Sequence, residues 1–456
     1  MSTSLQSPLA AASTSTAQTA PDTAAALRFI TCGSVDDGKS TLIGRLLLDS
    51  RAVLQDQLRN VTHQGSGQIN AAELSRLTDG LQAEREQGIT IDVAWRYFTS
   101  AARKFIIGDA PGHEQYTRNM VTAASQADCA VVLVDATKLP WAGQPDAAGA
   151  DTHALLPQTR RHTLLAHLLR VPQIVFAVNK LDAVAHDAAA FADISAALQA
   201  FCAQAGITPR AIVPVSALMG WNVVDARTDG WCGYQGPGLL PLLETLPVTP
   251  ADTEGPFAFP VQWIEKHASS ADISQARRIL WGRIASGRLA PQDRVTLHPS
   301  GQEATVLRVL DHVRRDTTGL ASPASAGIVL DRELDISRGD WLLQPGALTP
   351  TTTFEATLAW LDTTPLLPGR TYWALAGHSW VKARVTEITH QLDIHTLERQ
   401  PAGELDANAI GRVRIQLQAP LPLLPYRENR RLGSLILVDM ASNATAAAAL
   451  VDHIAP

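Results

Sequence analysis

Short apolar runs alternate with segments of helical periodicity over the first half of the chain. The runs lie at residues 29–32, 105–107, 129–134, 174–178 and 212–215. They are apolar almost throughout, not at every second position, so we expect strands buried on both faces of a mostly parallel sheet that has helices on each side. Ligands of such sheets bind beyond the carboxyl ends of the strands. The polar residues that follow these runs therefore form the candidate site.

The second half has a different pattern. Helical periodicity stops near residue 250, and short apolar runs bounded by Gly, Pro, Ser or Asp follow in two series, one from residue 257 to 343 and one from 354 to 438. This spacing predicts two antiparallel β-barrels. We expect a disordered leader over 1–26, rich in Ala, Ser, Thr and Gln, an α/β domain over 27–250, and β-barrel domains over 251–346 and 347–456.

Composition narrows the class of protein. The 456 residues are 46% hydrophobic and 18% charged, as in globular proteins, and the net charge of -6 without a basic run argues against a large nucleic-acid-binding surface. No segment is long and apolar enough to span a bilayer, and a signal-peptide pattern is missing, so we expect a cytoplasmic protein without a membrane partner. The four cysteines lie far apart in the sequence, which predicts reduced thiols; they are Cys32, Cys129, Cys202 and Cys232.

The strongest chemical signal is residues 33–41, with the sequence GSVDDGKST between a strand-like and a helical run. In that order, G-x-x-x-x-G-K-[ST] forms a phosphate-binding loop (P-loop), because backbone N–H groups and a helix N-terminus then face phosphate oxygens. We expect Lys39 to contact the β- and γ-phosphates and the Ser40 hydroxyl to bind Mg²⁺. The candidate phosphate contacts are Gly33, Ser34, Val35, Asp36, Asp37, Gly38, Lys39, Ser40 and Thr41.

Two further segments are candidates for sensing the terminal phosphate. Residues 84–92 have the sequence EREQGITID, in which Thr90 either completes Mg²⁺ coordination in the triphosphate state or only begins a strand. Residues 109–113, DAPGH, end an apolar run. Asp109 is expected to hold Mg²⁺, and the Gly112 N–H to meet the γ-phosphate. His113 either orients the attacking water or caps the next helix. The contacts expected here are Asp109, Ala110, Pro111, Gly112 and His113, and the Mg²⁺ ligands are Ser40, Thr90 and Asp109.

A base-recognition motif, NKLD, follows the run at 174–178. A carboxylate at Asp182 accepts two parallel hydrogen bonds from guanine, whereas adenine presents an acceptor there, so GTP is favoured over ATP. Asn179 is expected to bond the base and steady the loop, and the stem of Lys180 to cover one face of the base. The next strand exit either closes over the base or is an ordinary turn; its residues are Ser216, Ala217 and Leu218.

Together these motifs resemble those of translation-factor GTPases. The sequences around the motifs resemble those of the GTP-binding large subunit of bacterial sulfate adenylyltransferase. The resemblance is carried by residues 33–41, 84–92, 113–120, 158–162 and 234–237, and later by 284–287, 335–340, 428–430 and 441–446. Elongation factors typically have histidine where this chain has Asp37, which favours the sulfate family. Two features depart from that family. Ala110 stands where the family usually has threonine. An insertion at about 139–155 either is a solvated surface loop or alters the contact with a partner.

The resemblance implies a P-loop GTPase domain followed by two β-barrels, with GTP and Mg²⁺ as cofactors. It also implies a partner, the catalytic small subunit of sulfate adenylyltransferase, which makes adenylyl sulfate and pyrophosphate from ATP and sulfate. GTP hydrolysis would drive that synthesis if the segments around Thr90 and His113 shift the partner's conformational equilibrium. No second phosphate loop precedes Pro456, so we expect no adenylylsulfate kinase activity.

Two other functions stay open at this point. An elongation-factor-like GTPase that binds aminoacyl-tRNA would share the GTPase domain and both barrels, although Asp37 and the lack of a basic face argue against it. A catalytically silent GTP-binding scaffold would show no turnover even with a partner. In the barrels, His378 and His390 are typical of structural or solvated histidines, because no second metal ligand is spaced to join them. Residues 426–431 either face a partner or an anion, or form a solvated turn.

Overall fold

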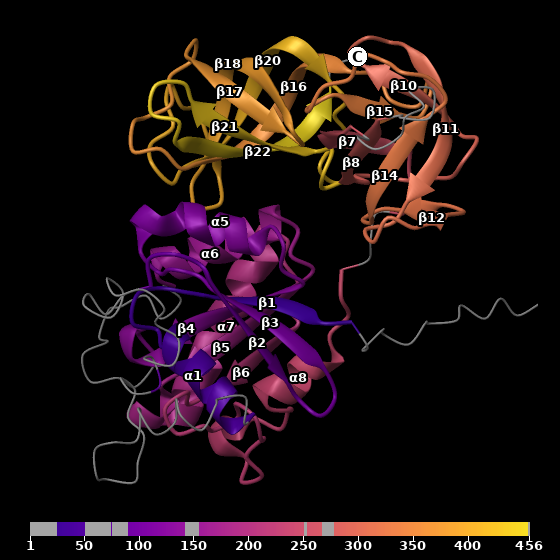
Figure 1. The fold of residues 1–456 in the computed structure, drawn as a ribbon. Helices are drawn as coiled ribbons and strands as arrows, with labels where there is room; N and C mark the ends of the chain where they lie inside the picture. The colour runs from indigo at the N-terminus through magenta and orange to yellow at the C-terminus, as the bar shows by residue number, and fades with distance from the viewer. Residues whose placement is uncertain are drawn as a thin grey trace, which may run out of the picture.

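The structure is a computed structural model, and it describes residues 25–50, 74, 90–141, 155–249, 253–266 and 278–454. Most of the expected leader and of the insertion, and residues 84–89 of the first phosphate-sensing segment, lie outside the described residues. Figure 1 shows a helix-and-sheet domain with two barrels lying side by side above it. None of the helices in the described part of the chain is both long and apolar enough to cross a bilayer.

The first domain is built on one sheet in the order β2-β3-β1-β4-β5-β6. All its neighbouring strands are parallel except β2, which runs antiparallel to β3. This confirms the mostly parallel sheet that the apolar runs predict. The strands are β1 (Leu27–Cys32), β2 (Ala94–Thr99), β3 (Lys104–Asp109), β4 (Cys129–Asp135), β5 (Gln173–Asn179) and β6 (Ala211–Pro214).

Helices cover both faces of the sheet because each central strand is apolar on both sides. Along β4, Val131 and Leu133 belong to a core shared with α1 and α8, while Val132 and Val134 belong to a core shared with α5, α6 and α7. The helices are α1 (Lys39–Asp49), α5 (Thr117–Ala124), α6 (Pro157–Leu168), α7 (Asp187–Ala205) and α8 (Leu239–Thr245). Short 3₁₀ turns follow several strands: η1 (Glu114–Tyr116), η2 (Ala136–Lys138), η3 (Leu181–Ala183) and, later, η4 (Trp231–Gly233).

Strand register brings the candidate residues to one edge of the sheet. Thr31, the penultimate residue of β1, pairs with Asp109 at the end of β3. Asp135, which ends β4, pairs with Asn179, which ends β5. The chemically distinctive residues therefore meet at the carboxyl edge, as the topology of such sheets requires.

The second half forms two antiparallel barrels. The first closes as β10-β15-β7-β8-β14-β11, because β11 pairs back with β10, and the second closes as β17-β21-β22-β16-β20-β18, because β18 pairs back with β17. Both barrels confirm the sequence prediction. Their strands, with the short flanking ones, are β7 (Ala258–Glu265), β8 (Ile279–Arg283), β9 (Arg288–Leu289), β10 (Arg294–His298), β11 (Glu303–Leu310), β12 (Asp316–Thr317), β13 (Leu320–Ala321), β14 (Ser325–Leu330), β15 (Trp341–Leu343), β16 (Thr351–Trp360), β17 (Thr371–Ala376), β18 (Ser379–Leu392), β19 (Arg399–Gln400), β20 (Ile410–Leu421), β21 (Ser434–Asp439) and β22 (Thr445–Ile454).

The turn at residues 426–431 fastens the second barrel to the first domain. The Tyr426 hydroxyl donates to Leu169 O at 2.9 Å, just beyond α6. Arg170 donates back to Tyr426 O at 2.8 Å, and the Arg430 guanidinium donates to Arg170 O. From the sequence alone, we expect this turn to face a partner, an anion or solvent. The structure adds a contact between domains that the sequence did not predict, where α5 and α6 face the second barrel (Figure 1), while Arg427 and Glu428 of the same turn are exposed.

Candidate guanine-nucleotide site

Two glycines allow the P-loop to turn between β1 and α1. Gly33 and Gly38 have φ angles of 146° and 93°, in the left-handed region that favours glycine. A Cβ atom on Gly33 would lie 2.6 Å from Leu133 O, and one on Gly38 would lie 2.4 Å from Asn179 Nδ2. The loop therefore lies directly against the ends of β4 and β5, where a larger residue would not fit.

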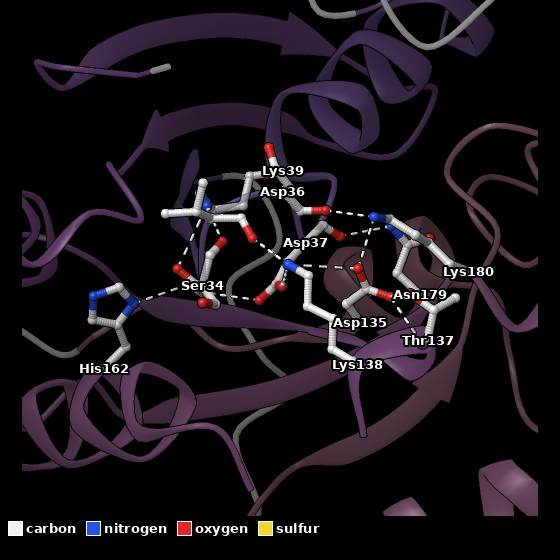
Figure 2. A network of polar contacts seen from close by, with 12 residues as sticks. Ser34, Asp36, Asp37, Lys39, Asp135, Thr137, Lys138, His162, Asn179 and Lys180 are labelled. Atoms are coloured by element: carbon white, nitrogen blue, oxygen red, sulfur yellow. Dashed lines mark hydrogen bonds and ion pairs between the residues drawn. The ribbon is translucent and has the colours of Figure 1, made fainter. Parts of the chain in front are cut away.

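The carbonyl oxygens of the loop are bound by side chains (Figure 2). Three lysines and one asparagine supply the donors; they lie in α1, in η2, at the end of β5 and just before η3. The contacts are Lys39 Nζ to Ser34 O at 2.7 Å and to Gly33 O at 3.5 Å, Lys138 Nζ to Val35 O, Lys180 Nζ to Asp36 O at 2.6 Å, and Asn179 Nδ2 to Asp37 O at 2.8 Å. Each carbonyl from residue 33 to 37 thus has a donor, which fixes the orientation of its peptide group.

The N–H groups of the loop divide into two sets. The Gly33 N–H donates to His162 Nδ1 at 3.1 Å, and the Ser34 N–H donates to Asp37 Oδ2 at 2.5 Å. The N–H groups of Val35, Asp36 and Gly38 have no acceptor among the described residues. Consecutive backbone N–H groups without an internal acceptor, next to a helix N-terminus, form an anion site. The arrangement suits the phosphates of a nucleotide.

The predicted Mg²⁺ ligands lie together beside this loop. The Ser40 hydroxyl donates to Asp109 Oδ2 at 3.2 Å and lies 3.5 Å from the Thr90 hydroxyl. Thr31 donates to the other oxygen of Asp109 at 3.1 Å and so holds the carboxylate in place. One carboxylate and two hydroxyls are hard oxygen ligands, which suit Mg²⁺ because that ion also keeps water and phosphate ligands. The described residues therefore fit the ion. They contain no cluster of three or more His, Cys, Asp or Glu that would favour another metal.

Lys39 and Gly112 are packed tightly against each other. The Lys39 side chain is buried; burial lowers the pKa of its ammonium group, and the charges of Asp37 and Asp109 oppose that shift. A Cβ atom on Gly112 would lie 2.5 Å from Lys39 Nζ and 2.9 Å from Ser34 O. The Gly112 carbonyl accepts a hydrogen bond from Gln158 Nε2 at 3.2 Å. The backbone of the second phosphate-sensing segment thus touches the P-loop directly.

The other residues of that segment differ in burial and in hydrogen bonding. Ala110 and Pro111 are buried, and the Ala110 N–H donates to Thr31 O at 3.2 Å. His113 precedes η1, and its partly exposed ring lies edge-to-face with Tyr116 at a centroid distance of 6.3 Å. The ring makes no hydrogen bond with any residue that the structure describes. Its position beside Gly112 is compatible with a role at the γ-phosphate, which stays a prediction.

Asn179 joins the P-loop to the two base-recognition segments. Its amide donates to Asp37 O, and its Oδ1 accepts from the Ala217 N–H at 3.0 Å. Asp182 lies in η3 with an exposed carboxylate that forms no hydrogen bond or ion pair with a described residue, so its oxygens are available to a base. The Ser216 hydroxyl accepts from the Met219 N–H at 3.1 Å, which shapes this turn. Three further candidates are only partly buried or exposed: Val35, Thr41 and Leu218.

Four residues that the sequence analysis did not assign also build the site. Lys138 lies 3.1 Å from Asp37 Oδ1, and Asp135 accepts from Lys180 at 2.7 Å. Burial would raise the pKa of Asp135, but hydrogen bonds from Lys180 and Thr137 lower it. Gln158 and His162 are four residues apart, so they share a face of α6. The i, i+4 spacing of Gln158 and His162 is the one feature of the sequence that could have indicated that they act together.

His162 is a neutral acceptor at the start of the loop. Burial, together with the charges of Lys39 and Arg161, lowers the pKa of its imidazole to about 3. Because Nδ1 accepts the Gly33 N–H, the proton of the neutral ring must lie on Nε2. The imidazole therefore holds the first peptide group of the P-loop without adding charge to it.

Comparison with known proteins identifies the class first. Residues 25–262 match the family described as elongation factor Tu GTP binding domain, and residues 353–452 match GTP-eEF1A C-terminal domain-like. The fold and the site thus define a translation-factor-type GTP-binding domain followed by two barrels. A solved structure of sup35 complexed with GDP is 22% identical with a TM-score of 0.41, and the match covers 95% of each chain.

Longer relatives narrow the class. Sulfate adenylyltransferase subunit 1 of Laribacter hongkongensis (strain HLHK9) is 41% identical over 439 residues, which are 94% of this chain and 86% of the relative. The bifunctional enzyme NodQ of Rhizobium sp. (strain BR816) is 42% identical over 431 residues, 93% of this chain and 64% of the relative. This chain therefore spans about 64% of the length of that NodQ relative. The chain belongs to the sulfate adenylyltransferase subunit 1 family.

Proposed function

We propose that this chain is the GTPase subunit of a sulfate adenylyltransferase. GTP hydrolysis here would drive a separate catalytic small subunit to make adenylyl sulfate and pyrophosphate from ATP and sulfate. The observation that carries the proposal is the P-loop, in which every carbonyl from residue 33 to 37 is bound while N–H groups remain for phosphates. Membership of the subunit 1 family supports the sulfate reaction. Because the substrates are ATP and GTP, the proposal includes a cytoplasmic location.

The two ends of the nucleotide meet different chemistry. The Asp182 carboxylate accepts the guanine N1–H and N2–H₂, and Asn179 holds the adjoining loop against Asp37 O. Lys39 and the free N–H groups bind the phosphates. Ser40, Thr90 and Asp109 would hold Mg²⁺, which when bound supplies positive charge beside the phosphate oxygens.

Hydrolysis requires a water in line with the bond to the γ-phosphate. His113 orients that water, and the Gly112 N–H bonds a γ-phosphate oxygen as negative charge shifts during bond cleavage. Loss of the γ-phosphate then removes the ligand contacts of Thr90 and Gly112. These residues therefore distinguish GTP from GDP, whereas the P-loop binds both.

Contacts at both ends of α6 support a route by which the proposed γ-phosphate contact acts on the second barrel. At its start, Gln158 bonds Gly112 O, and Arg161 pairs with Glu114 at 2.8 Å. Just beyond its end, Leu169 O accepts the Tyr426 hydroxyl of the second barrel. A shift of the Gly112 segment would displace the helix that carries the barrel, and a partner that contacts both parts would sense the change.

Reconstitution with the small subunit tests this function. The two subunits should co-purify, and sulfate-dependent release of pyrophosphate from ATP should rise strongly when GTP is added. A non-hydrolysable GTP analogue should give less product than GTP, because binding alone does not supply the free energy of hydrolysis. If pyrophosphate release is the same with and without GTP, the proposed coupling is wrong.

A second candidate function rests on the family descriptions that name elongation factors. In that case the chain would capture aminoacyl-tRNA in a GTP-dependent way. The net charge of -6 argues against it, because nucleic-acid binding depends on contacts between basic residues and phosphates. Filter binding distinguishes the two functions: tight, GTP-dependent capture of tRNA would favour the elongation-factor role. If the chain binds GTP but hydrolyses none with any partner, it is a GTP-binding scaffold.

A further inference from the structure

Lys138 is a charged residue of the site that neither the sequence motifs nor the proposed mechanism uses. It ends η2, directly after β4, and its ammonium group lies among three acceptors, two in the P-loop and one at the end of β4 (Figure 2). These are Val35 O, Asp37 Oδ1 at 3.1 Å and Asp135 Oδ2 at 3.6 Å. The Lys138 side chain is one-third exposed, whereas the side chains of Asp37 and Asp135 are 0% and 1% exposed.

Asp37 creates an electrostatic difficulty inside an anion-binding loop. Its Oδ2 accepts the Ser34 N–H, so the carboxylate helps to close the turn. Burial raises its pKa, and the positive charges of Lys39 and Lys138 oppose that shift. A buried carboxylate without a compensating cation would repel the phosphates that the loop is built to bind.

The charges around this carboxylate alternate in sign. Asp37 pairs with Lys138, Lys138 approaches Asp135, and Asp135 pairs with Lys180 at 2.7 Å. Lys180 is also bonded to Asp36 O, so the chain of charges returns to the P-loop. Asp135 keeps its own partner in Lys180, which leaves Lys138 as the cation that compensates Asp37 from outside the loop.

We propose that Lys138 is a positioning residue for the phosphates of the bound guanine nucleotide. It neutralises Asp37 and binds Val35 O, so that an acidic side chain shapes the P-loop without repelling the ligand. The inference rests on the proposed nucleotide site. Lys138 contacts the P-loop and neither Thr90 nor Gly112, so its removal weakens GDP and GTP equally.

The charge-compensation role is tested by a double-mutant cycle between Lys138 and Asp37. Lys138→Met should weaken binding of fluorescent GDP and GTP about tenfold, because it removes one of the two cations that compensate the buried Asp37 carboxylate and leaves only Lys39. Adding Asp37→Asn to that variant removes the charge and should restore affinity to within about twofold of Asp37→Asn alone. Lys138→Arg keeps the charge and should bind as the wild type does. Lys104→Met, at an exposed position of β3, is the matched control.

The outcomes distinguish charge compensation from the Val35 contact and from the absence of a nucleotide site. If Lys138→Met binds both nucleotides as tightly as the wild type, Lys138 does not position the loop. If Lys138→Met weakens binding as much in the Asp37→Asn background as in the wild type, the Val35 contact and not charge compensation is responsible, and the proposal is wrong. Should Lys138→Met fail to fold, the double variant decides, because the proposal requires it to fold and bind. A wild-type chain that binds no guanine nucleotide would instead refute the proposed function, and this inference with it.

Discussion

The two halves of the candidate site are built in different ways. In the P-loop, side chains bind each carbonyl from residue 33 to 37, and buried His162 and Asp37 accept the first two N–H groups. The proposed phosphate-sensing half consists of Thr90 and residues 109–113. There the Thr90 hydroxyl lies 3.5 Å from the Ser40 hydroxyl, and the His113 ring makes no hydrogen bond with a described residue. Among the described residues, the P-loop has an internal donor for each carbonyl from residue 33 to 37. We therefore expect the P-loop to be ordered before a ligand binds and the Thr90 and His113 side chains to gain contacts from the ligand.

This difference predicts different tasks for the two halves. A loop that folding has already ordered loses little entropy on binding, so it contributes affinity for any phosphate chain. Segments with fewer internal contacts change conformation more easily when a ligand group leaves. Variants of the P-loop should therefore affect GDP and GTP alike, and variants of the sensing half should separate binding from hydrolysis.

The largest effect is expected from Lys39→Ala. The variant removes a buried ammonium group that binds Ser34 O and faces Asp37 and Asp109, so each carboxylate loses a compensating charge. Affinity for GDP and GTP should fall about a thousandfold, measured by displacement of a fluorescent nucleotide. Lys104→Ala is the control. A fully active Lys39→Ala variant would contradict the P-loop assignment.

His113→Ala should separate the two halves most clearly. Loss of the water-orienting imidazole should slow single-turnover GTP hydrolysis about a hundredfold, while GTP and GDP affinities stay close to those of the wild type. His186→Ala, at an exposed histidine before α7, should hydrolyse GTP normally. Equal losses in binding and hydrolysis would show that His113 is structural.

Asp182→Asn tests the base end. Replacing the carboxylate removes an acceptor of two guanine donors, so GTP should bind about thirtyfold more weakly and xanthosine triphosphate should bind better. Competition titrations with both nucleotides measure the change. Unchanged preference for guanine would show that another residue recognises the base.

The smallest effect concerns pH. The pKa of His162 is about 3 in the folded protein, below the ordinary value near 6.5, so the unfolded state takes up the proton first as pH falls. The stability that neutral His162 contributes is therefore complete above about pH 6.5 and decreases toward pH 3. His162→Gln should lose less melting temperature between pH 7.5 and 5.5 than the wild type, by about 3 °C. His186→Gln should behave as the wild type, and an equal loss in His162→Gln would contradict the buried neutral acceptor.

Local sequence was sufficient for the residues whose chemistry lies in contiguous motifs. Gly33 follows a strand, and Lys39 and Ser40 begin the next helix, so their grouping can be predicted without the fold. The meeting of Asp109 with Ser40 followed from the rule that ligands bind at the carboxyl edge of such a sheet. The roles of these residues toward a ligand stay predictions.

Residues that act over long sequence separation could not be predicted in this way. Lys138 is a single lysine after a strand, and its contact with Asp37 depends on how β4 and the P-loop pack, 101 residues apart. His162 meets Gly33 across 129 residues, and Tyr426 meets Leu169 across 257. Strand β22 was missed for another reason: it is rich in alanine, which favours helices, but pairing with β16 and β21 determines its conformation.

The central claim is that the carboxyl edge of the sheet forms a guanine-nucleotide site whose phosphate half is preformed. Titration of the wild-type chain with GDP, GTP and ATP in the presence of Mg²⁺ tests it most directly. GDP and GTP should bind with affinities within about tenfold of each other, and ATP should bind at least about a hundredfold more weakly. ATP binding as tight as GTP binding would contradict the claim.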